Sequence, residues 1–141
     1  MFTLGLDLDG VCADYVAALR SYVAEERGIS PSDLPEPLSW RFEDADWGFA
    51  DQQHFLDTHI SAVKNGLFRT MPMIEGASEN LWELSEAGVD IRIITHRLVT
   101  KHLHATVAAD TVSWLDANDI PYRDICFVAK KVMVGADVYL D

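Results

Sequence analysis

The sequence predicts an α/β fold, with a Rossmann-like parallel sheet, helices on both of its faces, and a small, mainly helical cap. Apolar runs of strand type alternate with amphipathic helical segments, as a parallel sheet requires. Between residues 29 and 69 this alternation stops, and prolines, acidic residues and aromatic residues accumulate. We therefore expect a discontinuous core of residues 1–28 and 70–141, with residues 29–69 inserted as the cap.

The apolar run Phe2–Leu8 predicts the first strand, which two carboxylates interrupt at its end. A helical pattern follows, with Asp14 as its expected N-cap and Gly28 as its stop. Within the cap, residues 54–63 are expected to form a short helix. The cap is too rich in proline and acidic residues to continue the regular pattern.

The alternation resumes after the cap. A helix is predicted from about residue 77 to Gly88, and the strand 89–94 ends at Thr95. A second helix is expected over residues 101–117, followed by short strands at 125–128 and 136–140.

Four polar residues fall where predicted strands end. Asp7 and Asp9 follow the first strand, Thr95 ends the second, and Asp141 ends the last. Ligands of open parallel sheets bind beyond the carboxyl ends of the strands. Two carboxylates at a buried strand end lose solvation and repel each other unless a cation compensates. The pattern indicates a metal-assisted phosphate site, although an acidic Asp-Gly turn at Asp9 and Gly10 is a common alternative.

Composition limits the classes of partner. A chain of 141 residues with 49% hydrophobic and 24% charged residues fits one globular domain with a modest insertion. The net charge of −12 argues against binding a nucleic acid polymer or an anionic membrane. No apolar stretch has the length of a membrane span, and the N-terminus lacks a secretion signal, so we expect a cytoplasmic protein.

Four segments resemble the haloacid dehalogenase (HAD) superfamily of aspartate-nucleophile phosphohydrolases. They are Asp7-Leu-Asp-Gly-Val, Thr95 after its strand, Lys131, and Asp141 at the end of the last strand. Within the superfamily the chain looks most like the 5′(3′)-deoxyribonucleotidases, on the segments Asp7–Tyr15, Met71-Pro-x-x-Glu-Gly-Ala, and Lys131 through Gly-Ala-Asp-Val-Tyr-Leu-Asp.

The resemblance implies a role for each of these residues. Asp7 would be the nucleophile and Asp9 the general acid. A Mg²⁺ ion would lie between the Asp7 carboxylate, the Asp9 backbone carbonyl, Asp141 and waters. Thr95 and Lys131 would bind the phosphate and neutralise its charge. Considered alone, Thr95 could equally cap the next helix, and Lys131 could belong to a solvated basic pair.

The chain also departs from the family pattern. His96 follows Thr95 where a small residue or proline is usual, and we expect it to shape the pocket or contact the phosphate. The family usually has a second aspartate directly after the one at Asp141. The sequence stops there, which indicates a truncated chain or an unusually short protein.

In superfamily members with this layout, the cap selects the leaving group. Its aromatic side chains could stack on a nucleobase. The candidates are Trp40, Phe42, Trp47 and Phe68. The alternative for each ring is a place in the cap's own core.

The resemblance and the residues together favour a magnesium-dependent phosphomonoesterase, a HAD-type phosphatase whose substrate would be a small phosphorylated metabolite. A (deoxy)nucleoside monophosphate, and so a 5′-nucleotidase activity, is the leading expectation. Another small phosphate ester, such as a sugar phosphate, is the alternative within the same chemistry. A non-catalytic phosphate-binding protein that keeps the fold is the alternative from another class. The oligomeric state stays open, with a homodimer as one option.

Overall fold

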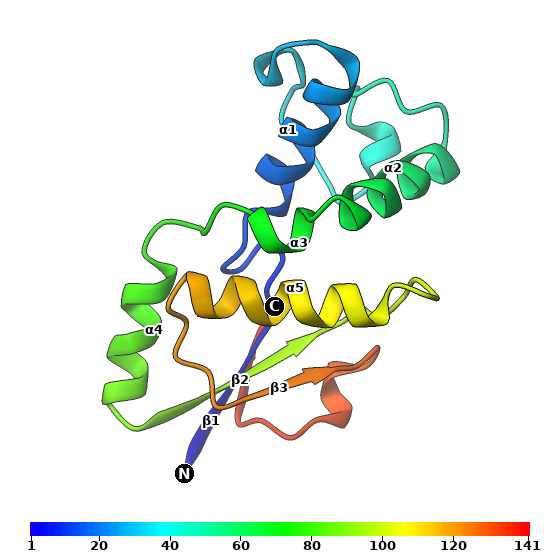
Figure 1. The fold of residues 1–141 in the computed structure, drawn as a ribbon. Helices are drawn as coiled ribbons and strands as arrows, with labels where there is room; N and C mark the ends of the chain where they lie inside the picture. Colours follow the sequence, from blue (N-terminus) through cyan, green and yellow to red (C-terminus); the bar gives the residue numbers. More distant parts are fainter.

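The computed structural model describes all residues 1–141 and has two lobes (Figure 1). One lobe holds the sheet, with strands β1 (Phe2–Leu6), β2 (Val89–Thr95), β3 (Asp124–Phe127) and β4 (Val138–Leu140). Its helices are α4 (Ala77–Glu86), α5 (His104–Ala117) and the 3₁₀ turn η3 (Lys131–Met133). The other lobe is helical, with α1 (Tyr15–Arg27), α2 (Gln52–Lys64), α3 (Leu67–Thr70) and the 3₁₀ turns η1 (Pro31–Asp33) and η2 (Phe42–Asp44).

The sheet has the strand order β3-β2-β1-β4, and every neighbouring pair is parallel. Leu4 on β1 is level with Ile91 on β2 and with Val138 on β4. The predicted parallel α/β fold is therefore confirmed. Because the strands are parallel, their carboxyl ends meet at one edge of the sheet, where the polar residues were expected to converge.

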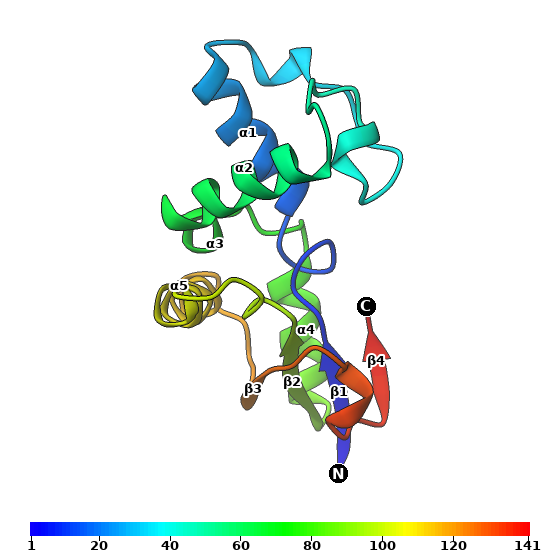
Figure 2. The same cartoon turned by 90° about the vertical axis from the view of Figure 1, so that its right-hand side faces the viewer.

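The two faces of the sheet are covered differently. Leu4 and Ile91 on one face share a hydrophobic cluster with Leu81 of α4 and Trp114 of α5. On the other face, Gly5 is approached closely by Tyr139 and other side chains of the C-terminal segment. Figure 2 shows η3 in front of the sheet and α4 behind it. Residues 1–141 thus supply a helical layer for one face, and the expected helices on the second face are not formed.

Helix α1 lies in the helical lobe, beside α2 and α3, in both views (Figures 1 and 2). Its ends are as predicted: the Asp14 carboxylate accepts a hydrogen bond from the Ala17 N–H, and Gly28 adopts a left-handed conformation with φ of 67°. Its apolar face packs on the other helices of this lobe. We therefore propose that the helical lobe spans residues 15–70, rather than the 29–69 expected from composition.

The lobes meet where α3 contacts α5. The buried Trp114 indole of α5 donates a hydrogen bond to the Met71 carbonyl at 2.7 Å. Nearby, Arg69 of α3 pairs with Asp110 of α5 at 3.3 Å. None of the helices has the length and apolar character needed to cross a membrane.

Candidate active site

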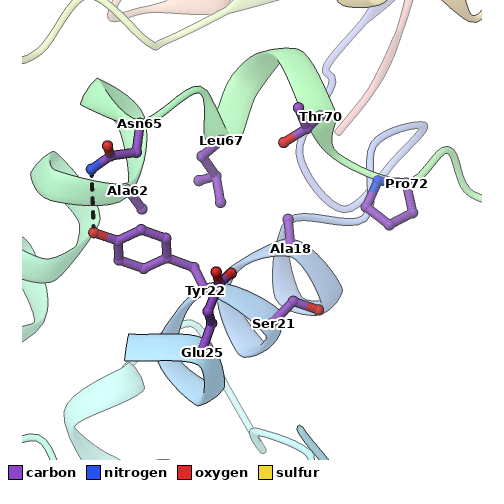
Figure 3. Close-up of a pocket in the computed structure, with 9 residues that line it drawn as sticks. All are labelled: Ala18, Ser21, Tyr22, Glu25, Ala62, Asn65, Leu67, Thr70 and Pro72. Atoms are coloured by element: carbon purple, nitrogen blue, oxygen red, sulfur yellow. Dashed lines mark hydrogen bonds between the residues drawn. The ribbon is translucent and has the colours of Figure 1, made fainter. Parts of the chain in front are cut away.

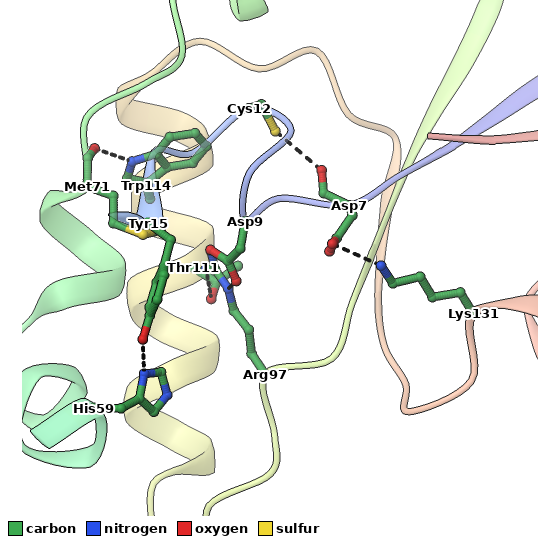
Figure 4. A network of polar contacts seen from close by, with 10 residues as sticks. All are labelled: Asp7, Asp9, Cys12, Tyr15, His59, Met71, Arg97, Thr111, Trp114 and Lys131. Atoms are coloured by element: carbon green, nitrogen blue, oxygen red, sulfur yellow. Dashed lines mark hydrogen bonds and ion pairs between the residues drawn. The ribbon is translucent and has the colours of Figure 1, made fainter. Parts of the chain in front are cut away.

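Two carboxylates from opposite ends of the chain meet at the carboxyl edge of the sheet. Asp7 follows β1, and its N–H donates to the Leu140 carbonyl of β4 at 3.0 Å. Asp141 follows β4 directly. The Lys131 ammonium bridges them: its Nζ lies 2.9 Å from Asp7 Oδ2 and 2.5 Å from Asp141 Oδ1. Figure 4 shows the Asp7 and Lys131 side chains pointing toward each other. Three residues predicted for the site are thus brought together.

The three charges perturb one another. Burial raises the pKa of the Asp7 carboxyl, and the hydrogen bond from Lys131 offsets this only in part. Asp141 is well exposed, so the hydrogen bond from Lys131 lowers the pKa of its carboxyl. Burial alone would lower the pKa of Lys131, but hydrogen bonds to both carboxylates raise it above its usual value. Lys131 therefore stays a cation, and it holds the two carboxylates side by side.

The Asp9 side chain points away from this group. In Figure 4 it extends toward Arg97 and α5, whereas Asp7 extends toward Lys131. Both Asp9 oxygens accept hydrogen bonds from the Arg97 guanidinium, at 2.6 and 3.2 Å. Asp9 is thus at the predicted edge, but it does not share the predicted cation position through its carboxylate.

Gly10 allows the chain to turn between the lobes. Its φ is +80°, a conformation that residues with a Cβ rarely adopt. A Cβ at this position would also lie 2.9 Å from Cζ2 of Trp40. The Trp40 ring therefore lies directly over the glycine and forms a wall of the site.

Two cavities adjoin the carboxylates. The first, of about 320 Å³, contains the acidic edge and is lined by Asp7, Asp9, Gly10, Val11, Trp40 and Asp141. The second, of about 220 Å³, lies against the helical lobe and is lined by Asp9, Tyr15, Trp40, His59, Phe68, His96, Arg97, Val99 and Thr100. Asp9 and Trp40 line both cavities, so they stand at the boundary between an acidic compartment and an aromatic one.

The second cavity has a polar pair in its wall. The Tyr15 hydroxyl of α1 and Nδ1 of His59 on α2 are 2.6 Å apart (Figure 4). Burial raises the pKa of the Tyr15 phenol and lowers that of the His59 imidazole. Both groups are therefore neutral near pH 7, and the tautomer of the imidazole decides which of them donates the hydrogen bond.

Cys12 lies next to the backbone of Asp7. Its Sγ is 3.5 Å from the Asp7 carbonyl, and burial raises the pKa of the thiol to about 12. A protonated, buried thiol is a poor nucleophile. Cys12 is free, as is Cys126. The chemistry of this site therefore depends on oxygen ligands and on nitrogen cations.

Thr95 and His96, at the end of the second strand, differ in exposure. Thr95, the last residue of β2, is 1% exposed and lies at the same edge as Asp7. Helix α5 begins only after Leu103, so Thr95 is not its cap. His96 is exposed and lines the aromatic cavity. A phosphate role for Thr95 and His96 stays a prediction.

The cap aromatics divide into two groups. Trp40 and Phe68 line the aromatic cavity, and their contact with a nucleobase stays a prediction. Phe42 and Trp47 are each 1% exposed and belong to the core of the helical lobe, so the expectation that they face the site is wrong. Phe42 stacks on Phe55, with 5.0 Å between ring centroids, and the Trp47 indole donates to a backbone carbonyl. Their rings are consumed by packing within a lobe that has few aliphatic residues.

The sequence did not identify five residues that line the aromatic cavity: Tyr15, His59, Arg97, Val99 and Thr100. Tyr15 is the buried first residue of α1. Arg97 carried a usable signal, because it follows the strand end at Thr95 by two residues. His59 carried none, since its neighbour in space is 44 residues away.

The donor set fits a small hard cation. No group of three or more His, Cys, Asp or Glu side chains in the structure could hold a metal ion together. Two carboxylates, of Asp7 and Asp141, do face one another, and a positive group already lies within hydrogen-bond distance of both. Oxygen ligands alone, completed by waters, are what Mg²⁺ prefers. With the Asp9 carboxylate turned toward Arg97, only the Asp9 backbone carbonyl would be left as the third protein ligand of the predicted ion.

A separate cavity of about 270 Å³ lies within the helical lobe (Figure 3). Ser21 and Glu25 of α1 line one side of it, and Asn65 and Thr70 line the other. None of the carboxylates at the sheet edge contributes to this cavity. It is therefore distinct from the candidate active site.

Comparison with known proteins agrees with this geometry. The model of the family described as 5′ nucleotidase, deoxy (pyrimidine), cytosolic type C protein matches residues 1–141. The chain belongs to this family. A putative 5′(3′)-deoxyribonucleotidase from Chlorobaculum tepidum is 45% identical over 141 residues, covering 98% of this chain and 68% of the relative. The predicted resemblance to the 5′(3′)-deoxyribonucleotidase family is confirmed.

Solved structures extend the comparison to the fold. A hydrolase from Streptococcus pneumoniae TIGR4 superposes with a TM-score of 0.58 at 14% identity, covering 89% of this chain and 65% of that structure. A HAD-superfamily hydrolase from Geobacter sulfurreducens PCA gives a TM-score of 0.48 at 19% identity, with coverage of 92% and 66%. The first likeness shows a shared α/β fold. This nucleotidase-family chain spans about two thirds of the length of the proteins it matches.

Proposed function

We propose that this protein is a magnesium-dependent phosphomonoesterase that hydrolyses (deoxy)nucleoside monophosphates in the cytosol, with Asp7 as the nucleophile. The observation that carries the proposal is the Lys131 ammonium held between the Asp7 and Asp141 carboxylates at the carboxyl edge of the sheet. Membership of the nucleotidase family supports the reaction class. The name of the Chlorobaculum tepidum relative supports a deoxyribonucleotide as substrate.

The residues of the acidic cavity would divide the work of phosphoryl transfer. An Asp7 oxygen would attack phosphorus while the bond to the leaving alkoxide breaks. Lys131 is a fixed cation beside that oxygen, so it would stabilise the charge on the transferring group. Bound Mg²⁺, held by Asp7, Asp141 and the Asp9 carbonyl, would supply Lewis-acid charge stabilisation. Thr95 and His96 would contact the phosphate from the neighbouring strand.

The aromatic cavity would receive the leaving group. It adjoins the acidic cavity at Asp9 and Trp40, and its walls carry Tyr15, Trp40, His59 and Phe68. Planar rings beside polar Tyr15 and His59 suit a nucleoside better than an acyclic or strongly charged leaving group. This favours a nucleotide over a sugar phosphate among the small phosphate esters.

The test is a panel of 5′- and 3′-nucleoside monophosphates, sugar phosphates and inorganic controls, assayed with Mg²⁺ and with a chelator. We expect Mg²⁺-dependent release of phosphate, with the highest kcat/KM for deoxynucleotides. Asp7→Asn keeps the shape of the side chain but removes the nucleophile, so turnover should fall by about a thousandfold or more.

Asp137→Asn is the matched control for that substitution. Asp137 lies before β4, where its carboxylate accepts a hydrogen bond from the Thr3 N–H at the far edge of the sheet. This variant should stay active. Equal, slow turnover of every ester would favour a general phosphatase, and phosphate binding without hydrolysis would favour a non-catalytic protein. Full activity in Asp7→Asn would contradict the assignment of the nucleophile.

A further inference from the structure

Arg97 makes more polar contacts than any other side chain beside the two cavities. Its side chain is 1% exposed. Nη2 and Nε donate to the two oxygens of Asp9, at 2.6 and 3.2 Å, and Nη1 donates to Oγ1 of Thr111 at 3.0 Å. The guanidinium carbon lies 4.1 Å from the centroid of the Phe68 ring. All three guanidinium nitrogens and one face of the group thus meet partners, and Figure 4 shows those contributed by Asp9 and Thr111.

These partners come from different parts of the fold. Arg97 follows β2, Asp9 follows β1, Thr111 belongs to α5, and Phe68 belongs to α3 of the helical lobe. A buried guanidinium is stable only when its charge and donors are satisfied. A bidentate pair also fixes the plane of the carboxylate, which a lysine at this position could not do. The direction of the Asp9 side chain is therefore set by Arg97.

The position of Asp9 gives this restraint a chemical consequence. Asp9 stands at the boundary of the acidic and aromatic cavities. If Asp7 attacks phosphorus and the nucleoside fills the aromatic cavity, the leaving oxygen, which joins phosphorus to the nucleoside, lies at this boundary. A proton delivered from Asp9 to that oxygen would complete the cleavage of the P–O bond, and the Asp9 carboxylate would then accept a proton from the water that attacks the acyl phosphate.

We propose that Arg97 is a positioning residue for Asp9, anchored by Thr111 and covered by Phe68 of the helical lobe. This inference rests on the proposed function. Arg97 itself touches no reacting atom. It holds the Asp9 carboxylate at the boundary, and a contact from the helical lobe completes its surroundings. Donation of a proton requires one Asp9 oxygen to leave the guanidinium, while Nη1 and the Phe68 ring keep Arg97 in place.

The test separates positioning from a general structural role through the leaving group. A deoxynucleotide leaves as an alkoxide and needs a proton, whereas p-nitrophenyl phosphate leaves as a stable phenolate and needs none. With Arg97→Lys we expect kcat for a deoxynucleoside 5′-monophosphate to fall about a hundredfold, the lower range for loss of an acid–base group. For p-nitrophenyl phosphate we expect less than about a fivefold fall, with KM little changed for both.

Two further variants guard against misfolding. Thr111→Val keeps the Asp9–Arg97 pair and removes only its anchor, so it should show a smaller change with the same dependence on the leaving group. Arg69→Gln is the matched control, since Arg69 adjoins Phe68 and pairs with Asp110 beside Thr111, yet lines neither cavity. It should leave both activities near those of the unmodified protein.

The outcomes distinguish this inference from the function on which it rests. An active wild type whose Arg97→Lys and Thr111→Val variants lose both activities equally, or lose neither, overturns the positioning role alone. A wild type that hydrolyses neither substrate overturns the proposed function as well. A selective loss on the nucleotide in both variants, absent in Arg69→Gln, supports the positioning role.

Discussion

At the scale of single residues, charge pairing decides which carboxylate can do what. Asp7 and Asp9 are separated by one residue, yet one faces Lys131 and the other faces Arg97. In a continued strand, residues two positions apart would point to the same side. The chain instead turns after β1, with the N–H groups of Val11, Cys12 and Ala13 donating to the Leu8 carbonyl, and a separate cation pairs with each carboxylate. Two similar side chains are thereby given different surroundings, which is how a fold assigns different tasks to the same chemical group.

A substitution at Gly10 tests whether the helical lobe must lie close to the loop that carries Asp7 and Asp9. In Gly10→Ala the new Cβ would meet the Trp40 ring at 2.9 Å, in addition to occupying a positive φ. We expect a loss of about 1–2 kcal/mol of stability from the backbone and a clear fall in kcat/KM, because Trp40 must move away from both cavities. Urea unfolding and steady-state kinetics measure the two effects.

Gly88→Ala is the control for Gly10→Ala. Gly88 also has a positive φ, of 96°, but an added Cβ would meet nothing within 4 Å. This variant should lose a similar amount of stability and keep its activity. If both variants lose activity to the same extent, the contact between Gly10 and Trp40 does not contribute to activity.

At the scale of residues, the sequence predicted the positions of charged side chains well and the positions of aromatic side chains poorly. Asp7 and Asp141 could be predicted to meet, because strand ends of a parallel sheet share one edge, whereas Lys131 was assigned to the site only by the family resemblance. Phe42 and Trp47 could not be separated from Trp40 and Phe68, because composition says that a ring is present but not which neighbour it meets. The Asp9–Arg97 pair was missed, since it joins residues 88 positions apart.

At the scale of elements, α1 shows how an amphipathic pattern can be right about a helix and silent about its partner. Its ends at Asp14 and Gly28 follow from capping rules. Its apolar face, which includes Leu19 and Val23, is buried as predicted. The pattern fits burial against a sheet or against other helices equally well, so the placement of α1 in the helical lobe required the tertiary structure.

The contact between Tyr15 of α1 and His59 of α2 should make the free energy of unfolding depend on pH. Burial lowers the pKa of His59 below its ordinary 6.5, with smaller opposing effects of Asp9 and Arg97. Below about pH 6.5 the unfolded chain therefore binds a proton that the folded protein excludes, so stability falls as pH falls toward the lowered pKa. One such group contributes a slope of at most about 1.4 kcal/mol per pH unit.

Unfolding by urea from pH 7.5 to 5 measures this slope. His59→Gln should flatten it by close to the contribution of one proton, because glutamine does not titrate. His104→Gln is the control, since His104 is an exposed first residue of α5. A slope that is the same in His59→Gln and in the unmodified protein would assign the pH dependence to other groups.

At the scale of the whole molecule, the two lobes enclose the site from two directions. The sheet supplies the acidic edge, and the helical lobe supplies the aromatic walls. The chain that forms both lobes has a net charge of −12. A strongly acidic protein repels a phosphate ester at long range, so local cations must reverse the field. Lys131 and the proposed Mg²⁺ do this within the acidic cavity.

Magnesium should therefore stabilise the folded protein as a whole. An ion that binds only the native state adds about 2.7 kcal/mol at a hundred times its Kd, which raises the melting midpoint by several degrees. We expect this shift with MgCl₂ and not with NaCl of equal ionic strength. Thermal unfolding followed by circular dichroism measures it without any assay of activity.

Asp7→Asn should abolish most of the magnesium shift, since one of the two facing carboxylates is lost. Glu86→Gln is the control, because it removes one negative charge at the end of α4, away from the cavities. An equal shift in both variants would indicate that Mg²⁺ acts through general screening of the negative charge.

The fold as a whole was largely predictable, because alternating strands and helices leave few arrangements for a parallel sheet. The restriction of the helical layer to one face of the sheet was not predictable. The periodicity of apolar residues indicates that a helix is amphipathic, but it does not indicate the side of the sheet on which the helix packs. Right-handed crossovers that move in one direction, from β1 to β2 and from β2 to β3, place both connecting helices on the same side.

The pairing of Asp7 with Asp141 has a consequence for the order in which the proposed site assembles during synthesis. The ribosome adds Asp141 134 residues after Asp7. A nascent chain that has already folded β1, β2 and β3 around their helices still lacks the docked β4, and with it half of the carboxylate pair. The proposed site is therefore complete only after Asp141 has been translated and β4 has paired with β1.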